Sequence, residues 1–352
     1  MAAYTTIDDP SAHFQTLLHN SSGNTAASYT FDGNSDLQPD LVWHKNRTVT
    51  DENYLFDSTR GAENAIYSNS TSAEVNHGNS LTSFDSNGYS VGSSNVTSGA
   101  GTYASWCWKA NGGTTSSNTD GTITSTVQAN TDAGFSIVTW AGNASNATMG
   151  HGLGATPQVI ISKARGTTND WNVYHRWIDN SAPYNYLLNL HNTNGSSAAT
   201  GSWGSSLSDI NSSTFYKKYW INYNTNMIAY CFAEKQGYSK FGVYYGNGST
   251  DGTFVYTGFK PAFVMVKRTN TTENWAIIDS TRDPYNLATK FLRADENSSE
   301  TAGNAANMDL LSNGFKLRNT DTKSNALSSR YVYMAFAENP FVSSTGVPTT
   351  AR

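Results

Sequence analysis

The sequence predicts an all-β protein made of tandem antiparallel β-sandwich modules of the jelly-roll or lectin-like kind, with one short N-terminal helix. Charged residues make up only 14% of the 352 residues, while aromatic residues reach 12% and glycine occurs 29 times. The apolar runs, such as "FSIVTW" and "QVIISKA", are short, rich in β-branched and aromatic residues, and bounded by polar turn residues. Similar segments also recur at long intervals, which indicates internal repeats.

The repeats are clearest around the tetrapeptide "DSTR", which occurs at 57–60 and again at 279–282. In both places a lysine, Lys45 or Lys267, stands twelve residues before the aspartate. A proline stands six residues before each lysine, and "SNGYSV" or "SNGFKL" follows further along the chain. The agreement extends too far to be coincidence, so the two regions are copies of one module.

A third, more diverged copy lies between them. Its lysine is Lys163, and Trp171 follows that lysine by eight residues, as Trp275 follows the lysine of the last copy. The position of the DSTR aspartate holds His175, and only the basic character is kept, in Arg176. The repeats are about 100 residues long, far above the 20–50 residues of solenoid units, so each is domain-sized or half of a larger sandwich.

This pattern predicts six segments. They are an N-terminal arm or helix for attachment at 1–24, the first β repeat at 25–110, a Ser/Thr/Gly-rich linker at 111–134, the second repeat at 135–235, the third at 236–341 and a tail at 342–352. The helix is expected within the arm because Asp8 or Asp9 can cap it, Pro10 suits its first turn, and Phe14 and Leu17 recur with helical spacing.

The recurring polar residues are interpreted as structural. The DSTR aspartate, at the end of a strand, is expected to pair with the arginine or to cap a turn. The recurring lysines are expected to protect an edge strand from pairing with another sheet. The full set of repeated structural residues is Lys45, Asp57, Arg60, Lys163, Arg176, Lys267, Asp279 and Arg282. Trp171 and Trp275 have two readings, as buried core residues or as aromatic faces that stack on a sugar ring.

Nothing in the sequence indicates catalysis, so the protein is expected not to be an enzyme and to need no cofactor. The two cysteines, Cys107 and Cys231, occupy equivalent positions where the third copy has Ala335, which indicates small buried residues rather than nucleophiles. The seven histidines lack metal-ligand spacing, and no metal site is predicted. A net charge of −5 argues against nucleic acid as a partner, and no apolar run is long enough to enter a membrane.

The segments "YYGNGSTDGTFVYTGFKPAFVMVKRT", "NWAIIDSTRDPYN" and "YMAFAENPF" resemble a repeat module of virion proteins from marine bacteriophages, including phages of cyanobacteria. The opening "YTTIDDPSAHFQTLL" and the ending "NPFVSSTGVPTTAR" are similar to the termini of that family. The family consists of tail-fibre-like or structural proteins. The resemblance therefore implies a location in the virion, after assembly in the host cytoplasm, and implies no catalytic residues.

Together these observations predict a non-enzymatic tail-fibre-like protein whose β modules bind the host surface, with a glycan as ligand. Its other expected partners are virion proteins and further copies of itself, with a trimer as the default. The alternative is a capsid decoration or capsid-fibre protein held by its termini. A polysaccharide depolymerase is a third, weaker alternative, for which the nearest acidic cluster is Asp279, Asp283, Asp295, Glu296 and Glu300.

Overall fold

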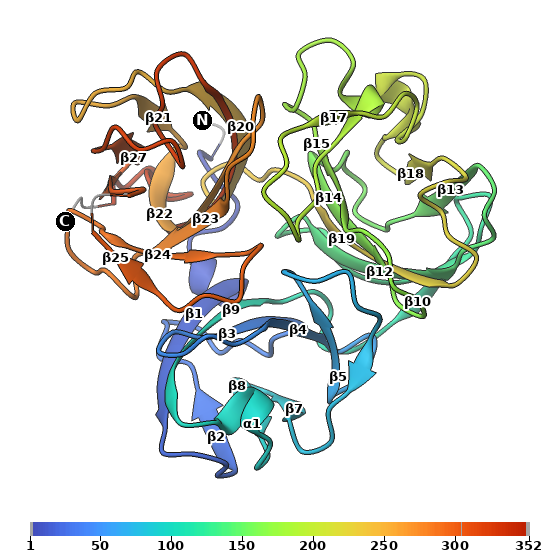
Figure 1. Cartoon of the computed structure of the whole chain (residues 1–352), viewed down its shortest axis with the longest axis horizontal. Coiled ribbons are helices and arrows are strands. Elements are labelled where there is room, and N and C mark those ends of the chain that lie inside the picture. The colour runs from blue at the N-terminus through green and yellow to red at the C-terminus, as the bar shows by residue number, and fades with distance from the viewer. Residues whose placement is uncertain (1–2, 304, 350–352) are drawn as a thin grey trace.

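The computed structural model, which describes residues 3–303 and 305–349, confirms the all-β class with antiparallel sheets. Three lobes surround a common centre (Figure 1). We call them module 1 (residues 14–109), module 2 (residues 116–233) and module 3 (residues 239–340). Each module contains one six-stranded main sheet that faces the centre and smaller sheets on its outer side.

The main sheets share a strand order. In module 1 it is β1 (Phe14–Ser21), β9 (Gly101–Trp108), β3 (Leu41–Asn46), β4 (Asn53–Asp57), β5 (Asn64–Tyr67) and β6 (Val75–Asn76). In module 3 it is β20 (Ser239–Tyr245), β28 (Arg330–Pro340), β22 (Phe259–Arg268), β23 (Trp275–Asp279), β24 (Lys290–Arg293) and β25 (Thr301–Ala302). The first and last long strands of each module are therefore neighbours, which closes each module on itself.

Module 2 has the same central strands and an extension at one edge. Its order is β10 (Ser116–Asn118), β11 (Ser125–Asn130), β12 (Phe135–Ala141), β19 (Asn226–Phe232), β14 (Val159–Ala164) and β15 (Asn172–His175). A separate pair, β16 (Tyr186–Leu187) and β17 (Ser197–Ala198), stands where modules 1 and 3 have their last two strands.

The outer layers contain the remaining elements. The outer strands are β2 (Ala27–Thr30), β7 (Leu81–Asp85), β8 (Gly88–Val91), β13 (Ala147–Gly150), β18 (Thr214–Lys217), β21 (Phe254–Tyr256), β26 (Met308–Leu311) and β27 (Gly314–Leu317). The short helices are α1 (Asn95–Ser98) and the 3-10 turns Pro10–Ala12, Pro183–Asn185 and Leu207–Asp209.

The main sheets are apolar on both faces because they separate two kinds of core. Along β22, Phe263 and Met265 point into a central cluster that all three modules share, whereas Val264 and Val266 point into the core of module 3 alone. The alternation follows from the two-residue period of a strand. Because all three modules contribute to the central cluster, they form one domain around one shared core.

The predicted N-terminal helix is wrong beyond its first turn. Asp9 does cap a 3-10 turn that begins at Pro10, but Phe14 already starts β1. Phe14 belongs to the central core and Leu17 to the core of module 1. A strand with apolar side chains on both faces can imitate helical spacing, and this one did.

The predicted linker at 111–134 is also wrong, because it contains β10 and β11. β10 lies at the edge of the sheet with Ser116 and Ser117 exposed, whereas β11 buries Ser125 and Gln128. Polar residues at both exposed and buried strand positions give this segment a composition typical of a loop. The first repeat likewise begins at β1, inside the predicted arm, rather than at residue 25.

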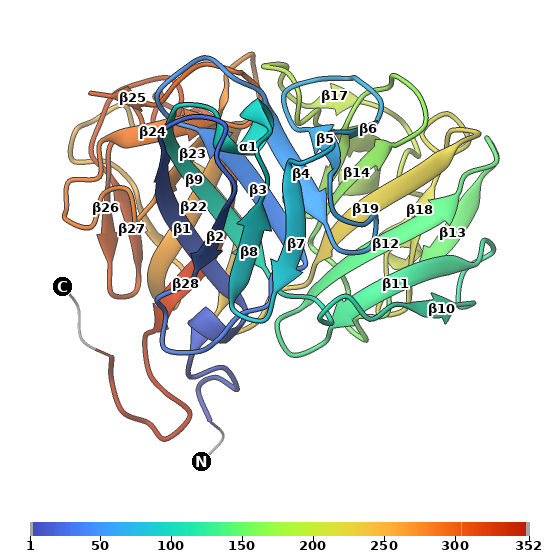
Figure 2. The same ribbon diagram turned by 90° about the horizontal axis from the view of Figure 1, so that it is seen from below.

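Both chain ends leave the molecule at the same end of the main sheets (Figure 2). The register agrees, since Phe14 and Leu41 both lie beside Trp108, whereas Lys45 is at the far end of β3. We call these the terminal end and the lysine end. Within the described residues, no helix is long and apolar enough to cross a membrane.

Candidate functional site

The three repeated lysines hold the modules together in a ring. Lys45 donates hydrogen bonds from Nζ to Asp51 O of its own module and to Asn297 O of module 3, 2.9 Å away. Each of the other two does the same: Lys163 bonds Asn169 O and Thr71 O of module 1, and Lys267 bonds Glu273 O and Thr193 O of module 2. Every module is thereby tied to the next, and the ring is closed.

The lysines do not lie at sheet edges, so the edge-protection prediction is wrong. Their strands β3, β14 and β22 each have a neighbour on both sides, and all three side chains are buried. Burial lowers the pKa of each lysine to about 8. Lys45, Lys163 and Lys267 are internal ties.

The DSTR loops form a second set of contacts between modules. Arg60 donates from Nε to Asp57 Oδ2 at 2.5 Å, and its backbone N–H donates to Asp57 Oδ1, so the expected pairing is present. The same carboxylate accepts a hydrogen bond from the Tyr230 hydroxyl of module 2 at 2.7 Å. In module 3, Asp279 is held identically by Arg282 and accepts from Trp106 Nε1 of module 1.

Two glutamates extend these contacts. Glu74 lies between Arg60 and Arg165 of module 2, and Glu300 lies between Arg282 and Arg47 of module 1. Burial alone would raise the pKa of both carboxyls, but the arginine pairs lower it below the ordinary value. Glu74 and Glu300 are therefore engaged in ion pairs between modules.

The structure explains why the DSTR aspartate is replaced in the middle copy, module 2. The residue equivalent to Tyr230 and Trp106 is Met334 of module 3, whose side chain has no hydrogen to donate. His175 accordingly replaces the aspartate and bonds through Nε2 to the backbone carbonyl of Tyr333 at 3.1 Å. Ile178, buried in the central core, takes the place of the arginine.

The sequence suggested that Arg176 is the counterpart of Arg60, and this prediction is wrong. Arg176 occupies the position of Ser58 instead. Its backbone N–H donates to Gln158 O, in the way that Ser58 N donates to Asp40 O in module 1. Its guanidinium lies 4.9 Å from the ring centre of Trp177. Without the aspartate, an arginine three residues later would have no carboxylate to pair with at this position.

The two repeated tryptophans are not sugar-binding residues. Trp171 and Trp275 are 0% and 2% exposed, and both belong to the central core. Their indole N–H groups donate across module boundaries, from Trp171 to Tyr67 O and from Trp275 to Asn189 O. The glycan-facing interpretation is wrong, since no sugar can reach either ring.

An open groove lies instead on module 2, with a volume of about 560 Å³. Its aromatic wall is Trp220 and Tyr223, and the opposite wall is the β16–β17 pair. Trp220 is 37% exposed. The polar residues that line it are Asp170, Asn172, Asn189 and Ser197. We call this the aromatic groove.

Two residues that line the groove differ from their counterparts in module 1. In module 1, Tyr54 and Tyr67 face each other across β4 and β5, with ring centres 5.5 Å apart. The equivalent residues of module 2, by the registers of β14–β15 and of the bridge between Val173 and Leu188, are Asn172 and Asn189. In module 2, two amides therefore stand where module 1 has two tyrosine rings, and they contribute polar groups to the lining of the groove.

Asn172, which lines this groove, has an unsatisfied acceptor that is itself buried. The residue is only 3% exposed, and its Oδ1 has no hydrogen-bond partner in the described part of the chain. Such a buried atom costs free energy unless a ligand or water pairs with it. Asp170 adds a 58% exposed carboxylate, 3.3 Å from His191 Nε2, and burial lowers the pKa of that histidine.

Sequence reasoning missed this groove because it gave most weight to what repeats. Trp220 and Tyr223 lie in "KKYWINYN", and the equivalent segment of module 3, "TDTKSNAL", has no aromatic residue. A signal was available in the residues that do not repeat, because this aromatic pair occurs in only one of the three modules.

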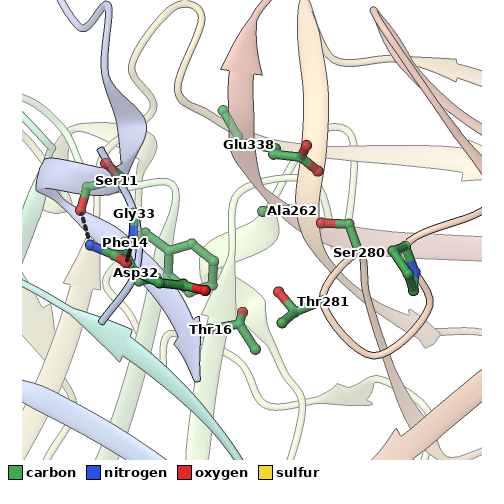
Figure 3. A pocket seen from close by; sticks show the side chains of 12 residues that line it. Ser11, Phe14, Thr16, Asp32, Gly33, Ala262, Ser280, Thr281 and Glu338 are labelled. Atoms are coloured by element: carbon green, nitrogen blue, oxygen red, sulfur yellow. Dashed lines mark hydrogen bonds between the residues drawn. The ribbon is translucent and has the colours of Figure 1, made fainter. Parts of the chain in front are cut away.

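A second opening, of about 320 Å³, lies between modules 1 and 3 at the terminal end (Figure 3). We call it the junction cleft. Gln15 and Thr16 of β1 line one side, and Ser280 and Thr281 of the DSTR loop line the other. The carboxylates of Asp32 and Glu338 lie at its rim, and Glu338 pairs with Lys260 at 2.7 Å.

The comparisons with known proteins identify a family. A family model described as a domain of unknown function (DUF7483) matches residues 9–340, and the chain belongs to this family. No curated protein and no solved structure matches the chain.

Proposed function

We propose that this member of the DUF7483 family is a non-enzymatic structural protein on the surface of a bacteriophage virion, which binds a host glycan in the aromatic groove of module 2. The observation that carries the proposal is the composition of the groove, which is lined by Trp220 and Tyr223 together with the amides of Asn172 and Asn189. An exposed aromatic face favours the apolar face of a sugar ring, and amides and carboxylates bind its hydroxyls.

The charges narrow the class of glycan. Asp170 is the charged residue of the groove lining, and the whole chain has a net charge of −5. Both disfavour uronic acids and phosphorylated sugars, because like charges repel. Neutral hexoses, whose hydroxyls can donate to the exposed Asp170 carboxylate, fit better.

The place on a virion is supported by the resemblance of the repeats to marine phage virion proteins and by the position of the groove. Asp170 follows Asn169, whose carbonyl accepts from Lys163, so the groove lies towards the lysine end. The two termini lie at the other end (Figure 2). A protein attached by its terminal end would present the groove outward.

Binding of neutral hexoses tests the proposal. We expect Trp220→Ala to weaken binding of glucose, galactose or mannose oligosaccharides by about fivefold, since a contact with one aromatic face contributes roughly 1 kcal/mol. Binding would be measured by calorimetry after a glycan array has identified the best oligosaccharide.

The matched control is Trp177→Ala, which removes a tryptophan of the same module that is exposed to the same degree, 36%, but does not line the groove. Equal loss of binding in both variants, or no oligosaccharide bound by the parent protein, would contradict the proposal.

A second candidate, a capsid decoration protein held by its termini, is favoured by one contact. Ser344 N donates to Asp8 Oδ1 at 2.5 Å, which joins the N-terminal and C-terminal segments at the same end. Cryo-electron microscopy of the virion separates the two candidates. Density at the tail supports the first, and density spread over the capsid supports the second.

A further inference from the structure

The edge of the main sheet differs between the modules. β1 in module 1 and β20 in module 3 are the last strands of their sheets. The equivalent strand of module 2, β12, pairs on its outer side with β11, from Asn130 opposite Phe135 to Thr126 opposite Thr139. In module 2, β11 therefore covers the sheet edge that corresponds to β1 in module 1 and β20 in module 3.

β11 also fills the space beside the DSTR loop of the preceding module. Gln128 donates from Nε2 to Ser58 Oγ at 2.9 Å and to Thr59 Oγ1 at 2.7 Å. Asp40 accepts from the backbone N–H groups of Gly112 and Gly113, which fixes the segment leading to β10. An added strand at this junction thus pairs with the sheet edge and binds a Ser-Thr pair through an amide side chain.

The junction between modules 3 and 1 has the same construction without the strand. Ser280 and Thr281 are the residues equivalent to Ser58 and Thr59, and they line the junction cleft opposite β1 (Figure 3). Their hydroxyls make no hydrogen bond within residues 3–303 and 305–349. The position of Asp40 is taken by Ala262, whose carbonyl accepts from Ser280 N, and this smaller side chain widens the space.

The N-terminal segment does not cover the edge because it is bound elsewhere. Tyr4 donates from its hydroxyl to Gly258 O, and Thr5 donates to Gln236 O, both in or beside module 3. Ile7 is buried in the central core. In the described part of the chain β1 has β9 as its paired strand and no second one.

We propose that the free edge of β1 and the junction cleft bind an extended strand of a partner protein. The strand runs antiparallel to β1, as β11 runs to β12, and places a glutamine or asparagine against Ser280 and Thr281. Asp32 and Glu338 at the rim favour a strand that carries a lysine or arginine beside that amide. The cleft is at the terminal end, so the partner is one that anchors the protein.

The inference is independent of glycan binding and can be tested with the strand the chain already provides. A second copy of residues 116–130 is fused ahead of Met1 through a flexible Gly-Ser linker, which gives it an effective concentration of about 1 mM at the cleft. We expect amide hydrogen exchange in Gln15–Ser21 to slow by about tenfold or more relative to the unfused protein.

Two matched fusions test the specificity. The fused copy carrying both T126P and V127P loses any backbone donor at its centre and should give no protection, because proline has no N–H. The fused copy carrying Q128A should give weaker protection, because Ser280 and Thr281 then lack their amide partner.

Three outcomes would overturn the proposal. One is an equal rate of amide hydrogen exchange in β1 of the fused protein and of its double-proline control. Another is a slowing of amide hydrogen exchange in β20 of the fused protein that equals the slowing in β1. The third is an unfused protein that is already dimeric with a protected β1, since a second copy would then occupy the edge.

Discussion

At the scale of single residues, the chain uses buried charged side chains to join its modules. Lys45, Lys163 and Lys267 each satisfy carbonyls from two modules, and Asp57 and Asp279 each accept from a neighbour's aromatic side chain. A buried charge is tolerated where it is fully hydrogen-bonded. This explains why such residues recur in a chain with so little charge.

Replacing one lysine tie should therefore be costly. We expect Lys163→Met to lower the free energy of unfolding by about 1–3 kcal/mol, because two half-buried carbonyls, of Thr71 and Asn169, lose their donor. Urea unfolding measures the change. Lys218→Met is the control, since Lys218 Nζ makes one exposed bond, to Thr200 O, and its loss should change stability by less than about 0.5 kcal/mol. Similar costs for both variants would show that Lys163 is not a tie.

At the scale of elements, the extra strand β11 is joined to the DSTR loop of module 1 by its inward amide, Gln128. Replacing Gln128 by alanine should lower the free energy of unfolding by about 1–3 kcal/mol, because Ser58, Thr59 and Gly113 lose a partner inside the junction. Hydrogen exchange in 116–130 should increase more than elsewhere. Thr126→Ala on the same strand, where the side chain is exposed, is the control and should leave that exchange unchanged. Uniform exchange across the whole chain would contradict a local role.

The repeats could be predicted from sequence because they preserve the ties. A lysine, and a DSTR aspartate twelve residues later, had to keep their spacing, since each reaches a fixed carbonyl or donor on another module. What those residues bind could not be predicted, because their partners, such as Asn297 for Lys45, lie 252 residues away. The burial of Trp171 has the same cause: a contact between modules leaves no local pattern.

Other elements were misread because local composition depends on their surroundings. β1 has apolar residues on both faces, as it separates two cores, and so imitated a helix. β10 is polar because it lies at an edge, and β11 is polar in part because its buried Ser125 and Gln128 make internal hydrogen bonds, so both strands resembled a linker. In the aromatic groove, Asn172 and Asn189 stand where module 1 has two tyrosines. Only the alignment of the paired strands reveals this difference.

At the scale of the whole molecule, burial of lysine should make the protein more stable in mild alkali. The pKa is lowered to about 8 for Lys45, Lys163 and Lys267 and to about 7 for Lys217, against 10.5 for an ordinary lysine. Above these values the folded state loses protons that the unfolded state keeps. The free energy of unfolding therefore rises with pH from about 7 to about 9.

Above about pH 9 the trend should reverse. Burial raises the pKa of Cys231 and of Tyr238, so these groups ionise first in the unfolded state, and stability falls as pH increases further. Urea midpoints measured between pH 6 and pH 11 would show the maximum. A midpoint that falls steadily from pH 7 to pH 9 would be incompatible with buried lysines of low pKa, and Lys163→Met should flatten the rise.

The cyclic homo-oligomer expected from the sequence stays a prediction. The structure does offer another origin for a trimer-like shape, since three modules of one chain already close a ring through the contacts of Lys45, Lys163 and Lys267. Further copies are not needed to complete that ring.

The covalent joining of the three modules has a consequence for how many ligands the protein takes. A ring of three identical subunits must repeat every feature three times. Here the modules have been free to differ: module 2 alone has paired asparagines, and the junction of modules 3 and 1 has an uncovered Ser-Thr pair beside a free edge. The chain therefore combines a threefold framework with single sites, and both glycan and anchoring strand should bind with a stoichiometry of one per chain.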